Sequence, residues 1–136
     1  MAYPTVSAPY GFQPINRIGG NPYAGSTRLV PVSSGAVYDG DLVELLSDGK
    51  CAVVSSGSAA AQALGVCVGV QYTNSSGQTV QAQYAPASGV TNVQAYVVDD
   101  PRALFKVAVV SSGTTMSSLG RTAVGQNTTV TFGKGN

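Results

Sequence analysis

The stretch from Tyr38 to Tyr72 constrains the fold most, because it alternates short apolar segments with strong turn sequences. Its segments 42–46, 50–54 and 64–72 each have the length of a β-strand. Ser-Asp-Gly at 47–49 separates the first two and predicts a hairpin, since glycine readily adopts the positive φ that tight turns require. The stretch therefore predicts three strands joined by short connections.

The segment from Leu64 to Tyr72 has the most regular pattern in the chain. Its apolar side chains recur at every second position, so one face of this strand is predicted to point into the core. The opposite face holds Gly65, Cys67 and Gly69, which occupy little volume and suit close approach by another sheet or an aromatic ring. We expect this strand to lie at the centre of a sheet.

Further short strands are predicted where Val and Tyr alternate with polar residues between turns that contain glycine or proline. They are 27–33, 36–38, 79–84, 93–98, 104–110 and, with a weaker signal, 128–132. A helical turn is predicted at 114–119, because Gly120 suits the position after a helix end. Together these elements predict an all-β fold, a compact small barrel or sandwich of about 7–9 short strands.

Residues 1–26 are predicted to form an extended N-terminal arm outside a β-domain that spans 27–136, in which 111–136 has the weakest signal. The arm holds four of the seven prolines, and proline disfavours both helix and interior strand. The alternative is a disordered tail, but such tails are usually poor in aromatic residues and this segment has four. We expect it to dock on a neighbouring surface through Tyr3, Tyr10, Phe12, Arg17 and Tyr23.

Charge is sparse, with seven Lys or Arg, six Asp or Glu, no His and a formal net charge of +1. The cations are scattered, whereas a protein that grips phosphates needs a cationic face, so nucleic-acid binding is disfavoured. Weak charge repulsion between copies favours a protein that works in an assembly. The absence of histidine removes the usual general base and the commonest metal ligand, so we predict no enzyme activity and no cofactor.

Cys51 and Cys67, the only cysteines, are too few for a secreted fold stabilised by disulfides. Both fall in predicted strands and are expected to be small core residues. The first residues lack the basic and apolar regions of a signal peptide, and no apolar run approaches the roughly 20 residues of a membrane span. We expect the chain to fold in a reducing cytoplasm, without a membrane partner.

Two charged clusters are candidate sites. The acidic residues between Asp39 and Asp48 lack the ligand spacing of a calcium loop, so we interpret them as ordinary turn residues and predict no metal site. In the segment Asp-Asp-Pro-Arg at 99–102, Pro101 predicts a β-turn in which it takes the second position. The functional alternative is an intersubunit contact made by Asp99, Asp100 and Arg102.

The order of several short motifs resembles the head decoration, or cement, proteins of tailed bacteriophages. The motifs are GFQP at Gly11–Pro14, GDLVELLSDG at Gly40–Gly49, LGVCVGVQY at Leu64–Tyr72, QYAPA at Gln83–Ala87 and AYVVDDPRALFKV at Ala95–Val107. They cover roughly residues 10–110 and leave 111–136 unmatched.

This resemblance implies a compact β-domain on the exterior of the capsid, commonly a homotrimer. Its partner would be the major capsid protein, and it would bridge capsomers and stabilise the shell of a virion made in the host bacterium. It brings no catalytic residues. A protein that touches several capsomers at once gains avidity, so each single contact can be modest.

An alternative is a carbohydrate-binding or fibre-type β-module of a phage or bacterial surface, with Tyr72, Tyr84 and Tyr96 as candidate sugar platforms. An enzyme with an unusual constellation and a single-strand-binding domain of the OB type are further alternatives, each with less support from the residues.

Overall fold

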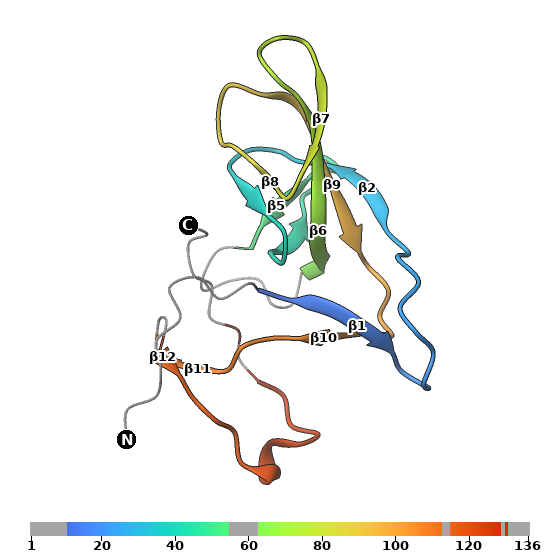
Figure 1. The fold of residues 1–136 in the computed structure, drawn as a ribbon, viewed down its shortest axis with the longest axis vertical. Coiled ribbons are helices and arrows are strands. Elements are labelled where there is room, and N and C mark those ends of the chain that lie inside the picture. The colour runs from blue at the N-terminus through green and yellow to red at the C-terminus, as the bar shows by residue number, and fades with distance from the viewer. Residues whose placement is uncertain (1–10, 55–62, 113–114, 129, 131–136) are drawn as a thin grey trace.

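The structure, a computed structural model, describes residues 11–54, 63–112, 115–128 and 130 (Figure 1). Twelve β-strands make up nearly all the regular structure of these residues, and the exception is the single 3-10 turn η2 (Arg121–Ala123). The predicted all-β fold is therefore confirmed. The strands outnumber the prediction for two reasons. The predicted segments 79–84 and 104–110 are each broken into two strands, and two strands, at Gln13–Arg17 and Thr115–Met116, form where none was predicted.

The centre of the fold is a six-stranded antiparallel sheet. Its strands follow the order β2 (Arg28–Pro31), β9 (Thr91–Val98), β6 (Ala63–Thr73), β4 (Leu42–Leu45) and β5 (Cys51–Val53), and β7 (Thr79–Ala82) also pairs with β6. β9 runs along one edge of β6, while β4 and β7 share the other edge. The predicted central position of this strand is confirmed.

Two glycines let neighbouring groups approach β6 closely. A Cβ atom added at Gly65 would run into the carbonyl oxygen of Val98 and would lie 2.9 Å from a methyl carbon of Val97. At Gly69 an added Cβ would lie 3.7 Å from the ring of Tyr96, which is an ordinary contact distance. The expected approach of an aromatic ring to this face is found at Gly69.

A β-bulge interrupts the alternation predicted for β6. Opposite β9, Cys67 pairs with Val97 and Gly69 with Tyr96, so Val68 is an extra residue without a partner on that strand. Val66 and Cys67 are therefore both buried although they are neighbours in sequence, and Val68 is only half-buried. The strict two-face pattern is wrong here, because one extra residue shifts the phase of a strand.

The buried core consists almost entirely of valine, alanine and cysteine. Val43 and Val97 come from the main sheet, and Val37 and Ala85 come from the short pair formed by β3 (Val37–Tyr38) and β8 (Tyr84–Ala85). An isolated parallel bridge joins Val32 to Cys51, so the chain after β2 contacts β5 at the opposite end of the strand order. The main sheet thus curls around the core and meets itself at one bridge.

Two smaller antiparallel pairs lie apart from the main sheet, in the lower half of Figure 1. β1 (Gln13–Arg17) pairs with β10 (Ala103–Lys106), and β11 (Val110–Ser112) pairs with β12 (Thr115–Met116). The helical turn predicted at 114–119 is wrong, since β12 occupies part of this segment and the 3-10 turn follows Gly120. Most of the strand predicted at 128–132 lies outside the described residues.

The tight contact at Gly65 predicts that Gly65→Ala destabilises the domain. The new methyl group would force β6 away from β9, and overpacking of this kind costs about 2 kcal/mol of unfolding free energy or more. Gly69→Ala is the matched control on the same strand, where the methyl group has room. Urea denaturation of the two variants measures the difference, and equal stabilities would contradict the packing described.

Candidate interaction surface

β1 belongs to the segment predicted to be an arm, and it is attached to the rest of the same chain at both of its ends. The backbone N–H of Phe12 donates to the carbonyl of Gly40 (3.0 Å), and that of Ile18 donates to the carbonyl of Arg102 (2.8 Å). The Phe12 ring packs edge-to-face against Phe105 of β10, with centroids 6.1 Å apart. Phe12 therefore contacts its own chain.

Gly40 is the junction between β1 and the main sheet. Its N–H donates to the carbonyl of Cys67 in β6 (2.7 Å), while its own carbonyl accepts from Phe12. A Cβ at Gly11 would overlap the Gly40 carbonyl, and Gly11 has a φ of 68°, so glycine is required there by both space and backbone conformation.

Asp41 stabilises the turn that contains Gly40. One of its carboxylate oxygens accepts a hydrogen bond from the backbone N–H of Tyr38 (2.9 Å), and its own carbonyl accepts from the N–H of Cys67 (2.8 Å). Burial raises the pKa of Asp41; the Tyr38 hydrogen bond opposes this rise and the charge of Asp39 adds to it. In this structure Asp39 and Asp41 shape a turn, as the sequence predicts for them.

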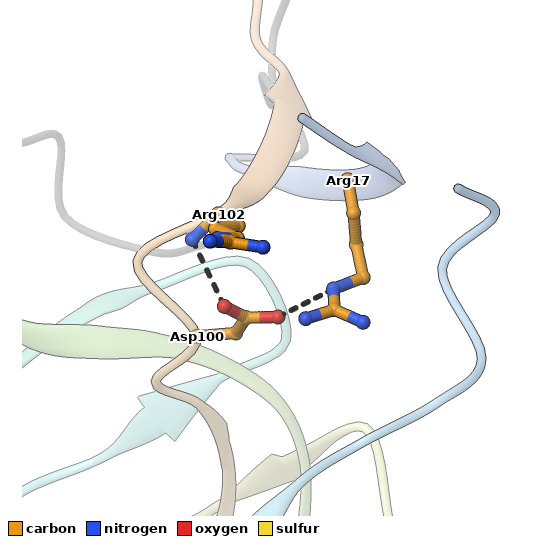
Figure 2. Close-up of polar contacts among 3 residues, drawn as sticks. All are labelled: Arg17, Asp100 and Arg102. Atoms are coloured by element: carbon orange, nitrogen blue, oxygen red, sulfur yellow. Dashed lines mark hydrogen bonds and ion pairs between the residues drawn. The ribbon is translucent and has the colours of Figure 1, made fainter. Parts of the chain in front are cut away.

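Arg17, Asp100 and Arg102 meet where β1 ends and β10 begins (Figure 2). The Nε atom of Arg17 lies 2.7 Å from one carboxylate oxygen of Asp100, and the backbone N–H of Arg102 donates to the other (2.9 Å). The backbone N–H of Ala103 donates to the carbonyl of Asp100 (3.1 Å), which closes the predicted turn with Pro101 at its second position. The pKa of Asp100 is lowered, first by the Arg102 hydrogen bond and then by the charge of Arg17.

Asp99 also has a partner in the same chain. Its carboxylate lies 2.8 Å from a terminal nitrogen of Arg28, the first residue of β2, and both side chains are partly exposed. Ion pairs with this exposure contribute at most about 1 kcal/mol. Both carboxylates of the 99–102 turn therefore neutralise arginines that lie far from them in sequence.

The structure gathers four of the predicted contact residues around β1 and β10. Phe12 and Arg17 flank or end β1, and Asp100 and Arg102 form the turn before β10. Tyr23 is half-buried, and burial raises its pKa. Tyr3 and Tyr10 lie outside the described residues.

A second feature of this region was not predicted from the sequence. Four large apolar side chains along or beside the β1–β10 pair are 42–58% exposed, namely Ile15, Ile18, Leu104 and Val107. Ile15 is the extra residue of a bulge between Pro14 and Asn16, so strand periodicity gives no warning of its exposure. We call β1, β10 and these four side chains the ribbon surface.

The three tyrosines proposed as sugar platforms have different surroundings. Tyr72 packs against the core, and Tyr96 lies near Gly69 with its hydroxyl donating to Gln71 (3.0 Å) and accepting from Gln81 (3.2 Å). Tyr84 is 51% exposed and stacks on Tyr38. Only Tyr84 among the three presents an open side chain.

The part of the chain that the structure describes contains no group of three or more acidic, cysteine or histidine side chains that could hold a metal ion. No helix within the same residues is long and apolar enough to cross a bilayer. Comparison with known proteins finds no matching family model, no matching curated protein and no matching solved structure.

Cys51 and Cys67 are both free and fully buried, in agreement with their prediction as core residues. Burial raises the pKa of Cys67 to about 12, and it also raises the pKa of Cys51. At pH 8 only about one Cys67 in ten thousand would be a thiolate. We expect Ellman's reagent to find no reactive thiol in the native protein and two after denaturation; rapid reaction of the native protein would contradict this burial.

The Arg17–Asp100 contact predicts a change in the titration of Asp100. Because the pKa of Asp100 is lowered in the folded protein, its carboxylate stabilises the fold at pH values above the ordinary aspartate pKa. This contribution to stability is lost as the pH falls through the folded-state pKa. Arg17→Ala should raise the pKa of Asp100 partway toward 3.8, because the Arg102 hydrogen bond remains. Carboxyl NMR shifts recorded against pH test this. Arg28→Ala, which removes the partner of Asp99, should leave Asp100 unchanged.

Proposed function

We propose that this protein is a capsid decoration protein that binds the outside of a phage head and bridges capsomers. The observation that supports this most directly is the ribbon surface, where four large apolar side chains are exposed, two of them within β1 and β10 and two directly after these strands. A two-stranded pair alone is marginally stable in water. It gains stability when another surface covers its apolar side chains.

The energy available from this cover is modest for each subunit. Full burial of a large aliphatic side chain contributes about 1.5–3 kcal/mol, so side chains that are already half-covered would add roughly 1 kcal/mol each. Association costs oppose this gain. A single ribbon surface therefore suits a protein that binds at several points at once, as a trimer on a repeating shell does.

Backbone pairing offers a second kind of contact. Among the described strands β10 pairs only with β1, and we propose that its other edge receives a strand from a partner. Strand addition of this kind supplies main-chain hydrogen bonds, while neighbouring pockets supply specificity. The major capsid protein or a second copy of this chain would provide that strand.

The shell is proposed as the partner because of the motifs GFQP, GDLVELLSDG and AYVVDDPRALFKV, whose order resembles that of head decoration proteins. GFQP contributes Phe12 to the contact with Phe105 and leads into β1. AYVVDDPRALFKV contains the Asp100 turn and β10. Two of these motifs thus build the ribbon surface itself, with Gly40 of the third as its attachment point.

Co-sedimentation with expanded, genome-free shells tests this function, using shells assembled from the major capsid protein encoded in the same genome. The wild-type protein should bind saturably at a fixed ratio to capsid subunits, and light scattering should give the mass of a trimer. Absence of shell binding by the wild-type protein would overturn the proposed function.

The variant Ile15→Ser with Leu104→Ser should weaken shell binding by about tenfold or more, because it removes two of the four apolar contacts. Val124→Ser is the matched control, since Val124 is 81% exposed but follows η2 and belongs to neither β1 nor β10. Circular dichroism of the double variant checks that the sheet is intact. Undiminished binding by a folded double variant would remove the ribbon surface from the mechanism.

A further inference from the structure

A hollow of about 480 Å³ lies at the end of the β3–β8 pair, lined by Tyr38, Asp39, Gln83 and Tyr84. Tyr38 and Tyr84 are directly opposite each other in the ladder. The next two residues continue the pairing, because the N–H of Asp39 donates to the carbonyl of Gln83 (2.7 Å). All four lining residues therefore have a backbone fixed by strand pairing.

The two tyrosines form an ordered aromatic platform. Their ring centroids are 5.5 Å apart and their planes differ by 13°, so each ring fixes the orientation of the other. Tyr84 is 51% exposed, whereas Ala85, the next residue of β8, is fully buried. An aromatic ring held in this way offers a flat surface to a ligand at little entropic cost.

Asp39 brings a negative charge to the hollow without a partner to neutralise it. In the described part of the chain its carboxylate has neither a hydrogen bond nor an ion pair, whereas Asp41, Asp99 and Asp100 all have one or the other. Asp39 is an exposed residue whose carboxylate is partly covered, and this partial burial raises its pKa. A cation placed beside it would pair with this charge.

We propose that this hollow binds the guanidinium group of an arginine side chain on a protein partner. Guanidinium is flat, weakly hydrated and always charged, so it stacks on a tyrosine ring and pairs with a carboxylate at the same time. The amide oxygen of Gln83 is a further acceptor for its N–H groups. Among the described residues no Lys or Arg lines the hollow, so the lining itself supplies no competing cation.

A neutral sugar is the competing ligand, since sugars also stack on tyrosine and hydrogen-bond to carboxylates. It would leave the charge of Asp39 without a counter-ion, and for this reason the observations favour arginine. Binding of small probes to the isolated chain does not depend on whether the chain binds a phage shell, so the result for this hollow is independent of the proposed function.

The test is an NMR titration of the full chain with N-acetyl-arginine amide. We expect shifts confined to the signals of Tyr38, Asp39, Gln83 and Tyr84, with a Kd in the millimolar range, as is common for a single side-chain probe. N-acetyl-citrulline amide has nearly the same shape without the charge and should bind at least about fivefold more weakly. Asp39→Asn should abolish this preference for the charged probe.

Two further variants complete the design. Asp48→Asn is the matched control, since Asp48 is an exposed turn aspartate that pairs with Lys50 outside the hollow, and it should bind arginine normally. Tyr84→Leu should weaken binding because it removes the aromatic face but keeps an apolar side chain. Absence of shifts at the hollow, equal affinity for the citrulline probe, or a preference for maltose over arginine would each overturn the proposal.

Discussion

Two backbone hydrogen bonds at Gly40 hold the parts of this molecule together. One joins Gly40 to Cys67 in the central strand, and the other joins it to Phe12 at the start of β1. Gly40 is buried and has a φ of 94°, so the turn depends on a residue without a side chain. On the β1 side of this junction lie three further contacts: the packing of Phe12 against Phe105, the pairing of β1 with β10 and the ion pair of Arg17.

The small residues of the core explain why the chain depends on its hydrogen-bonded ladders. Valine, alanine and cysteine fill the interior, and no aromatic ring is among the fully buried side chains of the described residues. Each such residue removes little apolar area from water, so the hydrophobic contribution per residue is low. Several larger apolar side chains, among them Ile15, Ile18 and Leu104, are exposed instead, which is consistent with a protein that completes its structure in an assembly.

Local features were predictable from the sequence, and distant pairings were not. The hairpin of β4 and β5 follows from Ser47-Asp48-Gly49, and the central place of β6 follows from its valine alternation and its glycines. The β1–β10 pair joins residues about 90 positions apart, and the prolines of the first 26 residues suggested an arm in its place. Likewise the 99–102 turn was correct, but its arginine partners, Arg17 and Arg28, were not predicted because ion pairs between distant segments leave no local pattern.

The two ends of the curled sheet, β2 and β5, meet at the single bridge between Val32 and Cys51, and we call this contact the seam. All other neighbours in the strand order share a ladder of at least three residue pairs. The seam has one bridge, the backbone hydrogen bond from Ser33 to Cys51 and a long hydrogen bond from the Cys51 thiol to the carbonyl of Val30 (3.9 Å). Fluctuations that open the sheet are expected to begin there, since fewest bonds must break. Such local opening would expose the thiol of Cys51 to solvent before that of Cys67. Exposure of Cys51 would then report local opening at the seam, and exposure of Cys67 would report opening of the whole fold.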